Sequence, residues 1–200
     1  CLLGWASSGA RLALFAELGS FLTVGLGYWT EAMNTLALVG VSVPLSVATG
    51  FALGVAGHAL PRLRRPLEVL LDFMQTVPAF AYLIPILLLF GFGPVVGLIA
   101  SAIYAAPPMV RNTMLGLREV PEAQIESGLM SGCTPFQLFR HVRLPGAMPQ
   151  ILVGLNQTTM QALSMVIIAA IIGGFDDIGW SVLSSLRKAQ FGQSLLAGLV

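Results

Sequence analysis

Polar side chains within one apolar stretch, residues 144–175, are the first candidates for chemistry in this sequence. Asn156, Gln157, Gln161 and Ser164 lie in it, and the last three recur at i, i+4 and i+7, which places them on one face of a helix. Amide and hydroxyl groups in such a segment either line a polar pathway or form hydrogen bonds to a neighbouring helix. Their spacing leaves both interpretations open.

Groups that could catalyse a reaction or bind a metal are few. His58 and His141 lie far apart without carboxylate or thiolate ligands at metal spacing, so we expect solvated loop histidines. Cys1 and Cys133 cannot form a disulfide framework. The single lysine, Lys188, is not followed by Ser or Thr, so the phosphate-binding pattern G-x4-G-K-[ST] is absent. We therefore expect no catalytic residue, no metal and no cofactor in this chain.

The overall composition is that of a chain solvated by lipid. Apolar residues make up 56% of the sequence and charged residues 10%, and the mean hydropathy is +0.85. Ordinary soluble domains carry about 25% charged residues. The composition excludes a disordered chain and argues against a soluble enzyme, and a net charge of +1 gives no support to nucleic-acid binding.

The uncharged stretches predict the membrane spans. As one helix, residues 73–110 would reach about 57 Å, nearly twice the hydrocarbon thickness of about 30 Å, so they must cross twice and turn at 91–94, where Gly and Pro favour a reversal. We expect an all-α polytopic membrane protein with about five to six transmembrane helices. Because the first residue is not Met and the last apolar run is short, we also expect a fragment lacking both ends. The expected helices are 12–28, 32–56, 67–90, 95–115, 147–172 and a sixth beginning near 190.

The positions of the few charges assign the sides of the membrane. With alternating spans, eight of the ten Lys and Arg residues fall on one side, which the positive-inside rule makes the cytoplasm. On the other side, Asp176 and Asp177 could attract a cation at the outer mouth, although we favour a solvated loop pair. The eight residues are Arg11, Arg62, Arg64, Arg65, Arg111, Arg118, Arg140 and Arg143.

The polar segment 111–143 lies between two expected spans and is too long for a simple connector. A helix should begin near Pro121 and Glu122, and the chain should break at 132–135. Thr134 is then a plausible N-cap with Pro135 at the first helical position. The second helix should stop before Pro145. Its expected apolar stripe consists of Phe136, Phe139 and Val142.

The same segment resembles a loop of permease subunits in binding-protein-dependent ABC importers. Their pattern is E-A-A-x3-G-x9-I-x-L-P; this sequence has Glu126 and Gly132 in place, with Ser127 and Gly128 at the alanines and Val142 at the isoleucine. Further stretches, 71–85, 106–111, 154–158 and 162–165, are similar to the glycine betaine/proline (quaternary amine) branch. The acidic pair in 173–179 departs from that branch and leaves the substrate open. The loop residues to which the resemblance assigns ATPase coupling are Glu126, Ser127, Gly128, Gly132, Cys133, Thr134, Pro135, Phe136, Leu144 and Pro145.

The resemblance implies that several proteins with different roles carry out transport together. Residues 1–200 would form a single transmembrane permease domain in the bacterial inner membrane, with a cytoplasmic coupling loop at about 117–146. A partner ABC ATPase would bind ATP and Mg, an extracytoplasmic binding protein would deliver a small quaternary amine or zwitterion, and a second permease subunit would complete a homodimer. The alternatives are an importer of another small solute, such as an amino acid, and a gradient-driven secondary transporter, which would have no ATPase for the loop to engage.

Overall fold

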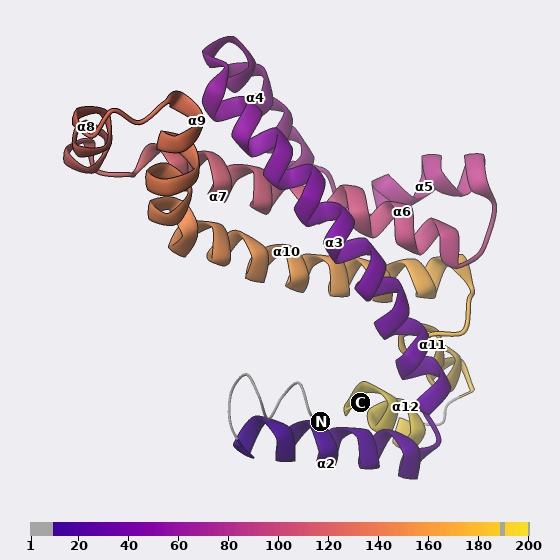
Figure 1. Ribbon diagram of the computed structural model, residues 1–200. Coiled ribbons are helices and arrows are strands. Elements are labelled where there is room, and N and C mark those ends of the chain that lie inside the picture. Colours follow the sequence, from indigo (N-terminus) through magenta and orange to yellow (C-terminus); the bar gives the residue numbers. More distant parts are fainter. Residues whose placement is uncertain (1–9, 189–190, 200) are drawn as a thin grey trace.

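The computed structural model describes residues 10–188 and 191–199, and within these residues it is helical without strands (Figure 1). Three long helical segments cross near the middle, and shorter helices lie at the two ends. The elements are α2 (Ala10–Leu26), α3 (Trp29–Ala59), α4 (Pro61–Thr76), α5 (Ala79–Phe90), α6 (Pro94–Tyr104), α7 (Ala106–Arg118), α8 (Glu122–Met130), α9 (Pro135–Leu138), the π-helix η1 (Phe139–Arg143), α10 (Leu144–Gly173), α11 (Ile178–Arg187) and α12 (Phe191–Leu199).

Small residues on α3 let it pack closely against α7. The buried positions of α3 are all Thr, Ser or Gly, so one face of the helix lacks bulky side chains. A Cβ atom added to Gly54 would lie 2.5 Å from the Cβ of Thr113 and 2.9 Å from the carbonyl oxygen of Val110. Such close backbone approach is typical of helix pairs in membranes, where burial from water does not drive association.

Helix α10 packs against a neighbouring face of α7, against α3 and against α6. A Cβ on Gly116 would lie 2.9 Å from the carbonyl oxygen of Ala147, so α7 and α10 also approach closely. Near α6, a hydrophobic core cluster contains Val96, Met165 and Phe175 among its buried members. Helices α3, α6, α7 and α10 therefore form one packed unit that carries the shorter helices.

By length and composition, three helical segments in the described residues are long and apolar enough to cross a membrane: Trp29–Ala59, Pro94–Arg118 and Pro135–Gly173. The pair α4 and α5 makes a fourth if it counts as one span. The spans expected at 12–28 and near 190 coincide with α2 and α12, which are shorter. The all-helical membrane fold is confirmed, and the three expected helices 32–56, 95–115 and 147–172 lie within these segments.

The expected helix 67–90 is wrong as one continuous element. It is bent by 94° between α4 and α5. Val77 adopts an extended conformation, with φ −71° and ψ 128°, because Pro78 follows it and disfavours a helical conformation at the preceding residue. The turn expected at 91–94 is present: Gly91 and Gly93 have φ angles of 74° and 138°, and α6 begins at Pro94.

Helix α11 was not expected, and the position of the residue before it corrects the sequence analysis. Asp177 is fully buried rather than solvated, and its side chain accepts a hydrogen bond from the backbone N–H of Gly179 as the N-cap of α11. It also accepts a hydrogen bond from the hydroxyl of Thr35 on α3. Asp176 is exposed, as expected, and its backbone oxygen accepts a hydrogen bond from Asn34 at 2.8 Å.

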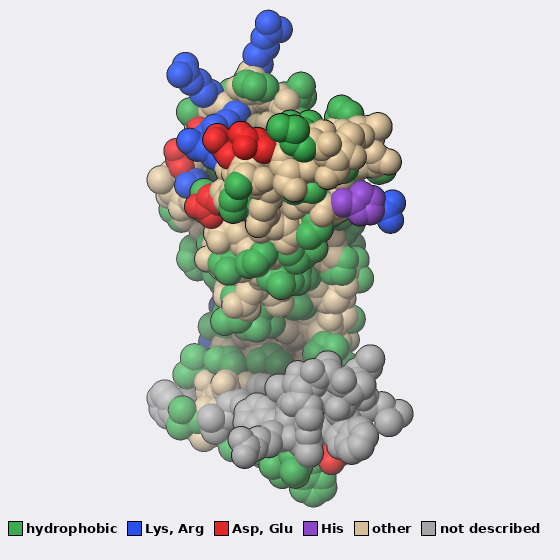
Figure 2. Space-filling model, turned by 60° about the vertical axis from the view of Figure 1, so that its left-hand side comes forward, with side chains coloured by type: hydrophobic (Ala, Val, Ile, Leu, Met, Phe, Trp, Pro, Cys, Tyr) green, Lys and Arg blue, Asp and Glu red, His purple; other side chains and the backbone are tan. Residues whose placement is uncertain are grey.

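Charged side chains gather mainly at one end of the molecule. Figure 2 shows most of the visible arginine and acidic side chains there, above a body with many apolar side chains. Helices α8 and α9 and the corner between α3 and α4 lie at this end, opposite α11 and α12 (Figure 1). We call it the loop end, and we call residues 31–35 with 174–179 the capped end. Cys1 and the side chain of Arg11 lie outside the described part of the chain.

Candidate functional site

The turn between α8 and α9 requires the glycine that the sequence pattern contains. Gly132 has φ +75°, in the left-handed region that glycine adopts without strain. The N–H of Gly132 bonds to the carbonyl of Leu129, and the N–H of Cys133 bonds to that of Gly128. This pair of hydrogen bonds is a Schellman motif, which satisfies carbonyl groups at the end of α8. Gly132 therefore fixes the direction in which the chain leaves α8.

The expected N-cap at Thr134 is confirmed and extends to a full capping box. The backbone N–H of Gln137 donates to the Thr134 hydroxyl at 3.4 Å, and the Gln137 side chain accepts from the backbone N–H of Thr134 at 2.9 Å. Pro135 occupies the first helical turn, where its missing N–H costs nothing. The start of α9 is thus specified by local sequence.

The helix does not stop before Pro145, contrary to the sequence-based expectation. Residues Phe139–Arg143 form a π-helix, and the chain continues directly into α10. The N–H of Leu144 bonds to the carbonyl of Phe139, five residues earlier. We attribute the continuation to this wider turn, because a proline ring in a regular α-helix clashes with the carbonyl four residues before it.

The loop presents an apolar surface that the sequence motif only partly identifies. Phe136 is 69% exposed, and Met130 beside the turn is 91% exposed. Phe139 and Val142 are half-buried, whereas Phe136 is exposed. The three residues of the expected stripe therefore do not face the same surroundings. Leu138, which the sequence analysis missed, is the buried member of this short helix. Glu126 is exposed and Gly128 is buried. We call Leu129, Met130 and Phe136 the loop knob.

A chain of three amide side chains connects α7 to α10. The Nδ2 atom of Asn112 donates to the Oε1 atom of Gln157 at 3.0 Å and to the carbonyl of Pro108 at 2.8 Å. The Nε2 atom of Gln150 donates to the Oδ1 atom of Asn112 at 2.7 Å. Asn112 is buried, so these bonds satisfy its polar atoms. Gln157 thus forms an interhelical hydrogen bond, and because it is also exposed, its place on a pathway stays a prediction.

The other polar residues of α10 are not gathered around this amide chain. Asn156 and Ser164 are exposed, and Gln161 is partly exposed. The Ser164 hydroxyl donates to the carbonyl of Met160 within its own helix. Asn112 and Gln150 were not among the residues expected from the sequence. Their polar character in apolar surroundings was the available signal, but the sequence does not indicate that they meet Gln157.

His58 is neither solvated nor in a loop, which corrects the expectation for this residue. It lies in the last turn of α3 and is half-buried. The Nη1 atom of Arg143 in η1 lies 2.8 Å from its Nε2 atom. His141 is exposed, as expected, but it lies in η1 rather than in a loop. Within residues 10–188 and 191–199, no three His, Cys, Asp or Glu side chains are grouped to hold a metal ion.

The long apolar helices define a polytopic membrane protein, and comparison with known proteins identifies the family. Residues 46–200 match the family model described as "Binding-protein-dependent transport system inner membrane component". The chain belongs to this family, as the loop motif implied, and it is a component of the inner membrane.

Curated relatives match nearly the whole chain. The glycine betaine/proline betaine transport system permease protein ProW of Escherichia coli (strain K12) is 41% identical over 99% of this chain and 56% of its own length. The glycine betaine transport system permease protein OpuAB of Bacillus subtilis (strain 168) is 41% identical over 98% of this chain and 70% of its own length. The chain thus spans about half the length of ProW.

Solved structures show the same fold at lower sequence identity. A structure described as an inward-facing conformation of the MetNI methionine ABC transporter has a TM-score of 0.72 and is 21% identical, covering 90% of this chain and 87% of that chain. A crystal structure of an amino acid ABC transporter with histidines has a TM-score of 0.71 and is 20% identical, covering 93% of this chain and 88% of that one. These likenesses confirm the fold.

Proposed function

We propose that this chain is the permease subunit of an ATP-driven ABC importer for a small quaternary amine or zwitterion of the glycine betaine, proline or choline type. The observation that carries the proposal is the match of about 40% identity, along nearly the whole chain, to relatives named for glycine betaine transport. Residues 1–200 form a single permease domain without catalytic residues. The partner ATPase binds ATP and Mg.

The loop end is the docking site for the cytoplasmic ATPase in this proposal. The loop knob offers apolar side chains that no other described element covers, next to the exposed carboxylate of Glu126. Exposed apolar residues beside a charged group are suited to a protein interface. Gly132 and the Thr134 capping box hold the knob on a short rigid turn, and α9 and η1 continue from this turn into α10 without a break. A movement of the docked ATPase therefore passes to the longest helical segment of the chain.

The exposed face of α10 lines the pathway in this proposal, and a second copy of the chain completes it. Asn156, Gln157, Gln161 and Ser164 supply uncharged polar groups on the accessible side of the helix, and the hydrogen bond from Asn112 fixes Gln157. At membrane depth, a polar atom needs a hydrogen-bond partner or water. These groups can therefore bind a zwitterion in place of water without leaving a polar atom unpaired. An extracytoplasmic binding protein delivers the solute.

The experiment that tests the function is reconstitution of the full-length subunit with its ATPase and binding protein in lipid vesicles. ATP hydrolysis is measured with glycine betaine, choline, proline or histidine in turn. We expect stimulation by one or more of the first three. Absence of stimulation by any betaine-like compound would remove the proposed substrate class, and stimulation by histidine alone would indicate an amino-acid importer. Solute uptake without the ATPase would indicate a gradient-driven transporter.

A further inference from the structure

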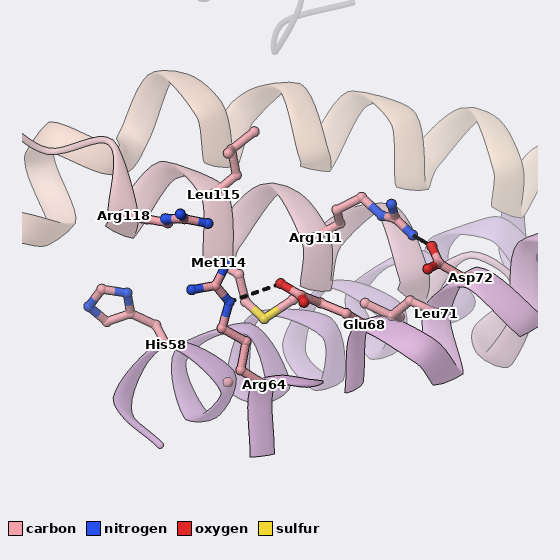
Figure 3. A pocket seen from close by; sticks show the side chains of 10 residues that line it. His58, Arg64, Glu68, Leu71, Asp72, Arg111, Met114, Leu115 and Arg118 are labelled. Atoms are coloured by element: carbon pink, nitrogen blue, oxygen red, sulfur yellow. Dashed lines mark hydrogen bonds and ion pairs between the residues drawn. The ribbon is translucent and has the colours of Figure 1, made fainter. Parts of the chain in front are cut away.

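A cavity of about 490 Å³ lies at the loop end, between the end of α3, α4 and α7 (Figure 3). Its size falls within the range of small-molecule sites. At one end, Arg111 forms an ion pair with Asp72 at 2.8 Å. At the other end, three helices supply His58, Arg64 and Arg118, which lie in Figure 3 on the side away from Asp72. The two ends of the cavity therefore differ: Arg111 is paired with a carboxylate, whereas Arg118 has no ion-pair partner among the described residues.

The tautomer of His58 is fixed by its neighbour outside the cavity. An arginine side chain only donates hydrogen bonds, so the Nη1 atom of Arg143 must donate to the Nε2 atom of His58. The ring proton therefore resides on Nδ1, where it can donate to another group. Because His58 also lines the cavity, the geometry is suited to a ligand that accepts hydrogen bonds.

The arginines at the His58 end of the cavity retain donors for such a ligand. The Nε atom of Arg64 bonds to the Oε1 atom of Glu68 at 2.9 Å, which leaves both Nη atoms of Arg64 available. Arg118 makes no ion pair within the part of the chain that the structure describes. The two carboxylates lining the cavity, Glu68 and Asp72, are each already paired with an arginine. An anion that enters here meets uncompensated positive charge.

The surroundings of the cavity favour a lipid as the source of this anion. Leu71, Met114 and Leu115 line the cavity beside the charged groups. On the outside of α4, Val69 and Phe73 are 68% and 65% exposed. A helix with exposed apolar residues and arginines near one end is typical of the membrane interface. Basic pockets between helices on the cytoplasmic side are suited to anionic headgroups.

We infer that His58, Arg64 and Arg118 form a binding site for the headgroup phosphate of an anionic phospholipid. The Nδ1–H of His58 and the free guanidinium N–H groups donate to the phosphate oxygens, and the acyl chains extend along the apolar residues of the cavity and of α4. Because Arg143 holds the other nitrogen of His58, this lipid would stabilise the contact between α3 and η1, directly after the loop knob. The inference requires the membrane location of the chain and is independent of the transported solute.

The test uses the full-length subunit purified in detergent. Its melting temperature is followed while phosphatidylglycerol, phosphatidylcholine or inorganic phosphate is added, since a ligand that binds the folded state raises the melting temperature. We expect stabilisation by phosphatidylglycerol alone. Arg118→Gln should weaken the apparent affinity about tenfold, because it removes a charge-assisted hydrogen bond. Arg62→Gln, on the same end but outside the cavity lining, is the matched control and should change the affinity less than about threefold.

Several results would overturn the site. Equal stabilisation by phosphatidylcholine, or equal losses in the Arg118→Gln and Arg62→Gln variants, would mean that no specific anion site exists. Stabilisation by inorganic phosphate to the same extent would reject the lipid as the source. His58→Leu provides a second variant if Arg118→Gln alters folding: retained phosphatidylglycerol binding in His58→Leu, with a normal melting temperature in phosphatidylcholine, would also contradict the proposal.

Discussion

Buried hydrogen bonds hold the capped end together, whereas an exposed ion pair, Arg111–Asp72, connects α7 to α4 near the loop end. At the capped end, Asp177 is fully buried and accepts hydrogen bonds from Thr35 and Gly179. Near the loop end, the two partners of the Arg111–Asp72 pair are 46% and 68% exposed. Exposed ion pairs contribute about 0–1 kcal/mol, but breaking a buried hydrogen bond leaves a desolvated group that costs about 1–3 kcal/mol.

This difference indicates where the molecule can rearrange. Contacts near the loop end can exchange with water or with a partner at little cost, so movements imposed on the loop knob meet low resistance there. Contacts at the capped end join α3 to the segment that links α10 and α11, and their loss lowers the free energy of unfolding more. We therefore expect the capped end to keep its conformation when the loop end moves.

The largest expected effect is the loss of the Asp177 side chain. Asp177→Ala removes the N-cap of α11 and the acceptor of the Thr35 hydrogen bond. We expect a loss of about 2 kcal/mol, which corresponds to a decrease in melting temperature of roughly 4–8 °C. The measurement is thermal unfolding of the full-length subunit in detergent. In the matched control Asp176→Ala, the backbone oxygen that binds Asn34 remains, and a decrease as large as that of Asp177→Ala would contradict the comparison.

A pH dependence should accompany this burial. Burial raises the pKa of the Asp177 carboxyl, against the opposing effect of the hydrogen bonds from Thr35 and Gly179. The folded protein therefore binds this proton more tightly than the unfolded chain does. The stability decreases as the pH rises from the ordinary aspartate pKa of about 3.9 to beyond the raised pKa of the folded protein. The melting temperature of the wild type should fall more steeply over this range than that of Asp177→Asn. Parallel curves would show that Asp177 does not titrate in this way.

The smallest expected effect is the loss of the exposed pair. Asp72→Asn removes the partner of Arg111 but leaves no buried group unpaired, because both side chains reach solvent. We expect a change of less than about 1 kcal/mol, or roughly 2–4 °C at most, in the same melting assay. If this variant lost as much stability as Asp177→Ala, the two ends would not differ as described.

Local features of the fold were predictable from sequence because their causes are local. The turn at 91–94 and the cap at Thr134 depend on residues within a few positions, and both are confirmed. The 94° bend was not predicted because proline alone does not identify a break: Pro44 and Pro85 lie inside helices, whereas Pro78 separates two.

The missed parts of the candidate site depend on partners far away in sequence. Asp177 is buried because Thr35, 142 residues earlier, lies beside it. The contact between His58 and Arg143 spans 85 residues, and that between Asn112 and Gln157 spans 45. Polar residues at these positions could be noticed in the sequence, but their pairing follows from the crossing of α3, α7 and α10. Whether such a residue is solvated, paired or available to a ligand is therefore a property of the packed helices.

The most direct test of the account is the number of solute molecules transported per ATP hydrolysed by the reconstituted complex carrying Gly132→Val. Valine is strained at the φ of +75° by about 1–2 kcal/mol, whereas asparagine tolerates this conformation, so Gly132→Asn is the matched control. We predict that Gly132→Val hydrolyses ATP but transports far less solute per ATP, with a melting temperature lowered by no more than in Asp177→Ala, and that Gly132→Asn remains coupled. An unchanged ratio in Gly132→Val would contradict the assignment of the loop end as the site of coupling.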